Sequence, residues 1–273
     1  QGAKIYGISS KRLSKIKIYY PKSKEEQQKI ADCLSSIDDL ITLTTKKIEA
    51  LKSHKKGLIQ LLFSAKGKKS PTIRFPEFQN AGDWRMEKLG HICNVVGGGT
   101  PDTRKPDYWN GDILWLTPSE VGHTKYIDNS KRKITELGLK NSSAQLLPIG
   151  TILLTSRATL GVMGILVKQA STNQGFHSLI VKKATDENYI YYLQDIIKKL
   201  CIKYAKGSTF LEVSSTSIKN FLVPYPPLEE EQQKIAGCLS SLDELITALT
   251  QKLEALKTHK KGLMQQLFPD MTE

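Results

Sequence analysis

The chain has 273 residues, and 39% of them are hydrophobic. This length exceeds the usual size of one compact domain and predicts a globular domain with additional extended helical material. The sequence has no apolar run of roughly eighteen residues and no charged-then-apolar leader, so we expect neither a membrane span nor a signal peptide. Its four cysteines lie far apart without a CxxC pair, which predicts ordinary thiols in a reduced, cytoplasmic setting.

The net charge of +13 is unevenly distributed along the chain. Residues 1–68 carry fifteen basic and six acidic side chains, residues 69–225 carry twenty and thirteen, and residues 226–273 carry five and eight. The basic middle of the chain indicates a polyanionic partner, and the opposite charges of the two ends favour their attraction to each other.

A long internal repeat is the strongest signal in the sequence. EEQQKIADCLSSIDDLITLTTKKIEALKSHKKGLIQLLF at residues 25–63 recurs at 230–268 as EEQQKIAGCLSSLDELITALTQKLEALKTHKKGLMQQLF, with 29 of 39 positions identical. Residues 2–21 align more loosely with residues 207–226. Copies so far apart cannot stack as neighbours in a solenoid, so they predict two paired arms separated by a domain.

Apolar residues recur in each arm at alternating steps of four and three, which is the pattern of a coiled-coil seam. The predicted seam comprises Ile30, Leu34, Ile37, Ile41, Ile48, Leu51, Leu58 and Leu62, and then Ile235, Leu239, Leu242, Ile246, Leu249, Leu253, Leu256, Leu263 and Leu267. Thr44, Lys55 and Lys260 interrupt it. Each arm opens with proline and glutamates and closes with HKK, which suits the helix dipole.

The arms are predicted to be rods of about 60 Å, since a helix rises about 1.5 Å per residue. They must run antiparallel, because the intervening domain leaves the end of one and rejoins at the start of the other. They are explained either as dimerisation handles or as docking surfaces. Outward-facing residues are repeated as well, which fits a recent duplication or two equivalent surfaces for two copies of one partner. These residues are Gln27, Gln28, Ser35, Ser36, His54 and His259.

The middle of the chain mixes strand-like and helix-like patterns. A strand-like stretch beginning KLGHICNVV is predicted to break at the three glycines Gly97–Gly99, and another strand is predicted through Trp115. Further strands are predicted at 151–155, 161–167 and 178–181, and an amphipathic helix over about 187–204. Such a mixture over about 155 residues indicates a single α/β or α+β domain.

Polar and basic loops of this domain suit DNA, because they combine phosphate-binding cations with short hydroxyl donors. The predicted DNA-contact residues are Arg104, Lys105, Tyr108, Lys131, Arg132, Ser156, Arg157, Thr159, Asn173, Gln174, Lys206, Ser208 and Thr209. Arg157 is suited to a bidentate contact with guanine, and Asn173 or Gln174 to one with adenine. For each of them a solvated surface position or an internal hydrogen bond is the alternative explanation.

Two features near residue 100 have ordinary structural explanations. Gly97–Gly99 match neither G-x-x-x-x-G-K-[ST] nor G-x-G-x-x-G, so a bulge or turn between strands is favoured over a phosphate-binding loop. Tyr108, Trp109 and Trp115 are aromatic residues of the kind that more often pack in a core or loop than stack on bases.

Motifs for catalysis are absent from the sequence. It has no NPPY-like methyltransferase motif and no Walker A loop, and residues 69–225 contain no Asp/Glu-x-Lys triplet of the common nuclease type. The five histidines do not fall at zinc-binding spacings. We therefore predict no catalytic residue, no metal site and no cofactor.

The sequence resembles the specificity subunits of type I restriction-modification systems over essentially its whole length. The segments that carry the resemblance are PKSKEEQQKIADCLSSIDDLI and PPLEEEQQKIAGCLSSLDELI, RFPEF, GGGTPDTRKPDYWNGDILWLTPSEV, TSRATLGVMGIL and TNQGFHSLIV. The resemblance implies target-recognition domains that alternate with two helical regions packed as an antiparallel coiled coil. It implies a non-catalytic subunit that reads half of a bipartite double-stranded DNA target and docks two methyltransferase subunits, with a restriction and translocase subunit joining through the complex.

The family pattern begins with a complete first recognition domain, whereas this sequence opens at what resembles the end of one. We therefore expect residues 1–20 to be the tail of a first recognition domain, 21–66 the central helical region, 67–84 a linker, 85–225 the recognition domain and 226–273 the C-terminal helical region. The sequence is then either a half-subunit that forms a self-dimer or a fragment. Two other functions stay open: a coiled-coil scaffold that binds proteins, and a nuclease or methyltransferase with a divergent site.

Overall fold

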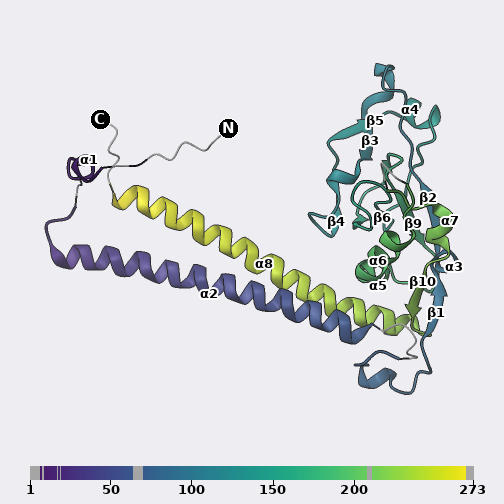
Figure 1. Cartoon of the computed structure of the whole chain (residues 1–273), viewed down its shortest axis with the longest axis horizontal. Coiled ribbons are helices and arrows are strands. Elements are labelled where there is room, and N and C mark those ends of the chain that lie inside the picture. The colour runs from purple at the N-terminus through teal and green to yellow at the C-terminus, as the bar shows by residue number, and fades with distance from the viewer. Residues whose placement is uncertain are drawn as a thin grey trace. The chain divides into compact units, whose positions relative to one another are not determined.

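The computed structural model describes residue 7, residues 9–16, residue 18 and residues 20–63, 70–207 and 211–268 (Figure 1). The chain divides into two compact units. Residues 1–54 and 243–273 form the first, here called the helical unit, and residues 55–242 form the second, here called the domain unit. A mixed α/β domain together with two 39-residue helices confirms the predicted fold class.

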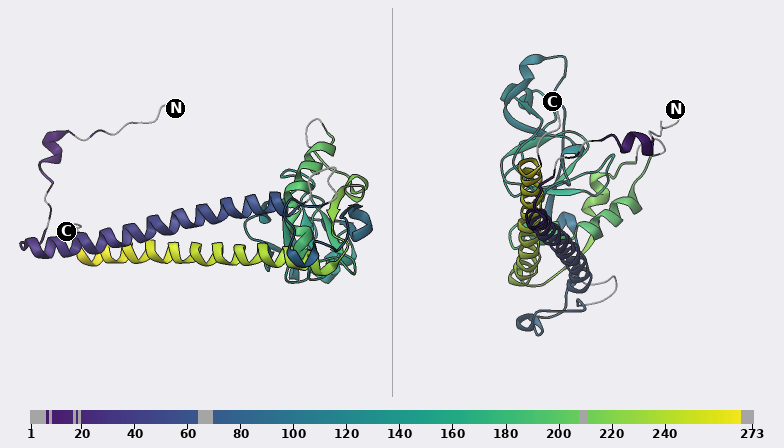
Figure 2. Two further views of the ribbon diagram at one scale, coloured as in Figure 1. Left: turned by 90° about the horizontal axis from the view of Figure 1, so that it is seen from below. Right: turned by 90° about the vertical axis from the view of Figure 1, so that its left-hand side faces the viewer.

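The helical unit contains α1 (Ser10–Leu13), most of α2 (Lys24–Leu62) and the second part of α8 (Glu229–Leu267). Within this unit α2 and α8 lie side by side and run antiparallel (Figure 1 and the left view of Figure 2). Ile37, Ile48 and Leu253 are buried between them, and so is the polar residue Thr44. The other predicted seam residues of this unit are half-buried: Ile30, Leu34, Ile41, Leu51, Ile246, Leu249, Leu256, Leu263 and Leu267.

A lysine at an interrupted seam position finds an acidic partner in the opposite helix. The Nζ atom of Lys260 forms an ion pair with Asp38, and both side chains retain contact with solvent. Because such a pair is accessible to water, its contribution to stability is small, and the apolar seam supplies most of the attraction.

The described residues of the domain unit form three β-sheets. The five-stranded sheet has the order β2 (Cys93–Gly97), β9 (His177–Val181), β6 (Ile152–Leu154), β7 (Met163–Leu166) and β4 (Tyr126–Ile127). The three-stranded sheet has the order β5 (Arg132–Ile134), β3 (Trp109–Leu116) and β8 (Ala170–Thr172), and β1 (Arg85–Lys88) pairs with β10 (Leu222–Tyr225). The α-helices of the unit, besides the ends of α2 and α8, are α3 (Leu89–Ile92), α4 (Glu136–Lys140), α5 (Glu187–Tyr192), α6 (Gln194–Tyr204) and α7 (Ser215–Lys219). Short 3-10 helices occupy Pro76–Phe78, Pro106–Tyr108 and Pro118–Glu120.

The apolar runs at 151–155, 161–167 and 178–181 form β6, β7 and β9, as predicted. The single helix predicted over 187–204 is instead two helices, α5 and α6, which are separated at Leu193. The strands β4 and β8, with two and three residues, are too short to show an apolar alternation in the sequence.

The largest hydrophobic core of the domain unit includes the ends of both long helices. Leu62 and Phe63 from the end of α2 and Ile235 and Leu239 from the start of α8 are buried with the side chains of α5, α6 and the five-stranded sheet. Ile235 and Leu239 were predicted as seam residues of a coiled coil, but they lie in this core because the first turns of α8 belong to the domain unit.

Two residues from the segment predicted as a linker hold the start of α8. The carboxylate of Glu231, which is 1% exposed, accepts hydrogen bonds from Nε and Nη2 of Arg74 at 2.7 Å each. It also accepts a hydrogen bond from the indole N–H of Trp84 at 3.0 Å. The hydrogen bonds that Arg74 itself makes to Glu231 raise the pKa of Arg74 above its usual value. Residues 70–84 therefore include a buried anchor for α8.

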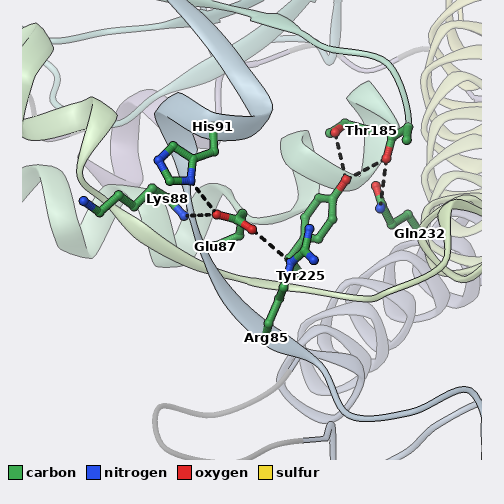
Figure 3. A network of polar contacts seen from close by, with 8 residues as sticks. Arg85, Glu87, Lys88, His91, Thr185, Tyr225 and Gln232 are labelled. Atoms are coloured by element: carbon green, nitrogen blue, oxygen red, sulfur yellow. Dashed lines mark hydrogen bonds and ion pairs between the residues drawn. The ribbon is translucent and has the colours of Figure 1, made fainter.

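The next residue of α8 enters a second polar network (Figure 3). The Gln232 side chain accepts a hydrogen bond from the backbone N–H of Asp186 at 3.1 Å. The Tyr225 hydroxyl donates to the backbone oxygen of Ala184 at 2.6 Å and lies 2.9 Å from the Thr185 hydroxyl. The Gln232 amide also donates to the backbone oxygen of Ala184 at 3.4 Å. Since Gln232 is fully buried, its two bonds replace the water that the amide would otherwise bind.

Candidate nucleic-acid interface

The loop between β6 and β7 presents Arg157 and Thr159 to solvent. Two backbone bonds close the loop: the N–H of Thr155 donates to Val162 O, and the N–H of Gly161 donates to Thr155 O, each at 2.9 Å. Ala158 at its tip has a φ of 60°, in the left-handed region that costs a non-glycine residue about 1–2 kcal/mol. The loop is therefore held in one shape by its base.

Ser156, one of the predicted contact residues, is fully buried and so cannot reach DNA from this position. Its backbone N–H donates to Gly175 O at 2.8 Å, and its backbone oxygen accepts from the N–H of Val213 at 3.1 Å. Ser156 therefore joins the β6–β7 loop to two other loops of the domain.

Arg157 and Lys206 come together through Glu212. Arg157 forms an ion pair with the Glu212 carboxylate at 2.9 Å, with both side chains partly exposed. Lys206 and Glu212 exchange two backbone hydrogen bonds of 2.9 Å. The predicted contact residues Ser208 and Thr209 lie outside the described residues.

His177 lies near this group of charges. Burial lowers its pKa below the usual value, while the nearby carboxylate of Glu212 opposes that change. The ring is therefore neutral at pH 7 and adds no positive charge to the surface.

Asn173 and Gln174 form the turn after β8. The Asn173 side chain accepts a hydrogen bond from the N–H of Gly175 at 2.9 Å, so part of its amide is already used inside the turn. Gln174 is exposed, and its side-chain oxygen accepts from the Thr100 hydroxyl at 2.7 Å. Gln174 is therefore the more accessible of the two amides.

The glycine run at 97–99 permits close packing of the backbone beside this turn. A Cβ atom on Gly98 would lie 1.9 Å from the backbone oxygen of Asn173, and one on Gly99 would lie 2.3 Å from the backbone nitrogen of Ala144. These contacts account for Gly98 and Gly99 as positions of close backbone approach, whereas a Cβ atom on Gly97 would make only an ordinary contact of 3.8 Å.

A second group of predicted residues surrounds a cluster of aromatic rings. Arg104 makes two hydrogen bonds to the Asp102 carboxylate, at 3.1 and 3.0 Å, and these bonds lower the pKa of Asp102 to about 2. The Nζ atom of Lys105 donates to the Tyr108 hydroxyl at 3.1 Å. Tyr108 itself is buried, with 7% of its surface exposed, so it packs in the cluster and is not available to stack on a base.

Arg132 lies over the rings of this cluster. Its guanidinium carbon is 3.5 Å from the ring centroid of Trp109 and 5.5 Å from that of Trp115. The two indoles meet edge to face, with centroids 5.1 Å apart. Next to Arg132, the backbone N–H of Lys131 donates to Glu120 at 2.7 Å, while the side chains of Lys131 and Arg132 are exposed.

Residues 99–104 link the two groups. Thr100 contacts Gln174 in the first group, and the backbone oxygen of Gly99 accepts from the Trp115 indole in the second at 2.9 Å. The predicted residues that are exposed, together called the candidate surface, are Arg104, Lys105, Lys131, Arg132, Arg157, Thr159, Gln174 and Lys206.

The sequence did not single out Glu212 as the partner of Arg157 or Trp109 as the partner of Arg132. Glu212 lies far from Arg157 in the chain, and only the fold brings them together. Trp109 was predicted to pack, and it does so while also supporting a charged residue.

Over the described residues, no three His, Cys, Asp or Glu side chains come together in a group that could hold a metal ion. In that same part of the chain, no helix combines the length and apolar character needed to cross a membrane.

The model of the family described as type I restriction modification DNA specificity domain matches residues 1–53 and 81–258. The chain belongs to this family. The match confirms the resemblance found in the sequence.

Two curated relatives and one solved structure illustrate the similarity. The chain is 40% identical over 194 residues to the type I restriction enzyme MjaIX specificity subunit of Methanocaldococcus jannaschii, covering 69% of this chain and 44% of that protein. It is 28% identical over 253 residues to the EcoR124I/EcoR124II specificity subunit of Escherichia coli, covering 90% and 60%. The crystal structure of the type I S subunit from M. genitalium has a similar fold, with a TM-score of 0.63, 22% identity and coverage of 100% and 68%. The chain thus spans about half the length of these curated relatives.

Proposed function

We propose that the domain unit reads one half of a split double-stranded DNA target, and that the long helices dock the methyltransferase subunits that act on it. The observation that carries this proposal is the gathering of exposed cationic and amide side chains on loops that a rigid scaffold holds together. Binding residues on loops of a fixed core are the usual arrangement for recognition.

The exposed lysines of the surface suit phosphate contacts, and their loss should weaken binding to all sequences alike. Lys105, Lys131 and Lys206 are exposed and come from three separate segments of the chain, so each offers its own contact to a phosphate. Arg157 and Gln174 are exposed among them and present the side-chain types that read guanine and adenine.

The docking surface is proposed on the faces of the helices that lie away from the seam. Leu40 and Leu245 occupy equivalent positions of the repeat, and 47% and 41% of their respective surfaces are exposed. An exposed apolar residue at the same place in both helices provides two equivalent anchors, which fits two copies of one partner.

No methyl transfer or cleavage is assigned to this chain. In the proposed complex those reactions belong to the methyltransferase subunits and to a restriction and translocase subunit, acting on DNA in the cytoplasm. The role of this chain is to position the DNA-reading domains, because helices of fixed length hold them at a fixed separation along the duplex.

Selection from a randomised duplex pool tests the DNA-reading proposal. The chain, mixed with a type I methyltransferase subunit from the same source, is incubated with the pool, and the retained DNA is sequenced. We expect enrichment of a short defined sequence, palindromic with a fixed gap if the chain forms a dimer. An intact complex that enriches no sequence would contradict the proposal and favour a protein-binding scaffold.

Stoichiometry tests the docking proposal. Mass photometry of the chain with the methyltransferase subunit should show two bound copies, one copy for Leu40→Asp or Leu245→Asp alone, and none for the double variant. Leu43→Asp is the matched control, since Leu43 is 62% exposed but has alanine at its repeat equivalent. Two bound copies in the double variant would exclude this surface.

A further inference from the structure

We propose that Arg132, held over the indole of Trp109, is the residue that reads a guanine in the major groove. This inference rests on the proposed function and adds to it the role of one side chain. It follows from a difference among the three arginines of the candidate surface.

Two of these arginines are already bound by carboxylates. Arg104 makes a two-bond contact with Asp102, and Arg157 is paired with Glu212 at 2.9 Å. A guanidinium engaged in this way has fewer N–H donors left for DNA, and it must first break a charge-assisted contact to use the others.

Arg132 is in a different situation. Within the described part of the chain, it has no carboxylate at ion-pair distance, and its side-chain contacts are the two indole rings. The side chain is nonetheless exposed. Its charge is therefore balanced only by the ring faces, and its N–H donors are available.

The rings that hold Arg132 are fixed by their own contacts. The Trp109 indole donates to the backbone oxygen of Asp102 at 3.3 Å, and the Trp115 indole donates to that of Gly99 at 2.9 Å. Arg132 is also opposite Trp115 in the register of β5 and β3. The guanidinium is thus supported by two anchored rings on a sheet, so little rotamer entropy remains to be lost on binding.

This geometry matches the edge of guanine. Stacking uses the face of the guanidinium and leaves its in-plane N–H groups pointing outward. Two parallel N–H donors match the O6 and N7 acceptors of guanine, which is the commonest specific contact of arginine with DNA. A lysine at the same position keeps the charge and the attraction to the ring but lacks the planar pair of donors.

Parallel selections test the inference. The wild-type chain, Arg132→Lys and the control Arg85→Lys are each mixed with the methyltransferase subunit and incubated with the randomised duplex pool. Arg85 is the matched control, because its guanidinium also lies over an aromatic ring, that of Tyr225 at 5.3 Å, but is paired with Glu87. Figure 3 shows Arg85 bonded to Glu87 beside Tyr225, and none of these three residues belongs to the candidate surface.

We expect the wild-type chain and Arg85→Lys to enrich the same sequence. Arg132→Lys should lose discrimination at a single guanine by about ten- to a hundredfold, which is the range for one bidentate contact, and keep it elsewhere. Arg132→Gln should relax the same position, and equal melting temperatures of all variants would establish that each is folded.

The outcomes separate the inference from the proposed function. An unchanged sequence preference in Arg132→Lys and Arg132→Gln, with a clear preference in the wild type, overturns the role of Arg132 and leaves DNA reading in place. A uniform loss of preference at all positions also overturns it, because a structural role would act on the whole surface. A wild-type chain that enriches nothing overturns the proposed function, and with it this inference.

Discussion

Helices α2 and α8 contain the two copies of the repeat, and each is 39 residues long, yet their first turns have different surroundings. In α8, Glu231 is buried against Arg74 and Trp84. The equivalent residue of α2, Glu26, is exposed. The comparison teaches that the repeated sequence makes both segments helical. Whether an identical residue in them is buried or exposed depends on which other segments of the chain pack against each copy.

The same contrast extends along the first turns. Gln232 is fully buried and bonded to Asp186, while its equivalent Gln27 is exposed and donates to the nearby backbone oxygen of Pro21 at 2.6 Å. The start of α8 is thus part of a folded core, and the start of α2 makes mainly local contacts within the described residues.

Replacing the equivalent glutamates Glu231 and Glu26 by alanine should give the largest difference in unfolding free energy between the two copies. Glu231→Ala leaves the Arg74 guanidinium, 10% exposed, without its buried partner and should lower the free energy of unfolding by about 3–5 kcal/mol. Glu26→Ala removes only a favourable charge at a helix start, which is worth about 0.3–1 kcal/mol. Urea denaturation of both variants measures the difference, and equal losses would contradict the account.

Replacing the equivalent leucines Leu239 and Leu34 by alanine should give a smaller difference in unfolding free energy. Leu239 is fully buried in the core of the domain unit, so Leu239→Ala should cost about 2–5 kcal/mol of unfolding free energy. Leu34, its equivalent, is half-buried, and Leu34→Ala should cost less because fewer contacts are lost. Thermal unfolding of the two variants gives the comparison. A larger destabilisation in Leu34→Ala would contradict the assignment of the first turns of α8 to the core.

The paired cysteines offer a chemical comparison. Cys33 is exposed and Cys238 half-buried, so a thiol reagent should modify Cys33 faster in the folded chain. Burial raises the pKa of Cys93 and of Cys201 to about 12. At pH 8 these two thiols are therefore about one part in ten thousand thiolate, and they should react only on unfolding. Peptide mapping after timed labelling measures the order, and early modification of Cys93 or Cys201 would contradict it.

The smallest effect is expected at the Lys260 ion pair of the helical unit. Because 27% of the Lys260 side chain and 54% of the Asp38 side chain are exposed, Lys260→Gln should change the unfolding free energy by no more than about 1 kcal/mol. Denaturation at low and high salt checks this value, since the wild-type contribution should fall with salt. A loss several times larger would show that the pair, and not the apolar seam, holds the helices together.

The sequence predicted the helices better than the site. A seam repeated over many heptads identifies a helix because every turn adds evidence. The strand β4, by contrast, has only two residues, and the break between α5 and α6 falls at Leu193, a residue type that gives no signal of a helix end. Arg132 and Arg157 were selected by residue type alone. Their partners, Trp109 and Glu212, depend on which strands and loops meet, and Tyr108 and Ser156 were selected but are buried for the same reason.

Photo-cross-linking of the chain to DNA tests the central claim most directly, because it separates a domain unit that contacts DNA from helices that serve assembly. A duplex retained from the pool, substituted with iododeoxyuridine, is irradiated in the complex, and the cross-linked peptides are identified by mass spectrometry. The account predicts cross-links within residues 100–108, 130–133, 156–160 and 173–175, and none within 24–54 or 243–267. Cross-links confined to the two long helices would contradict it.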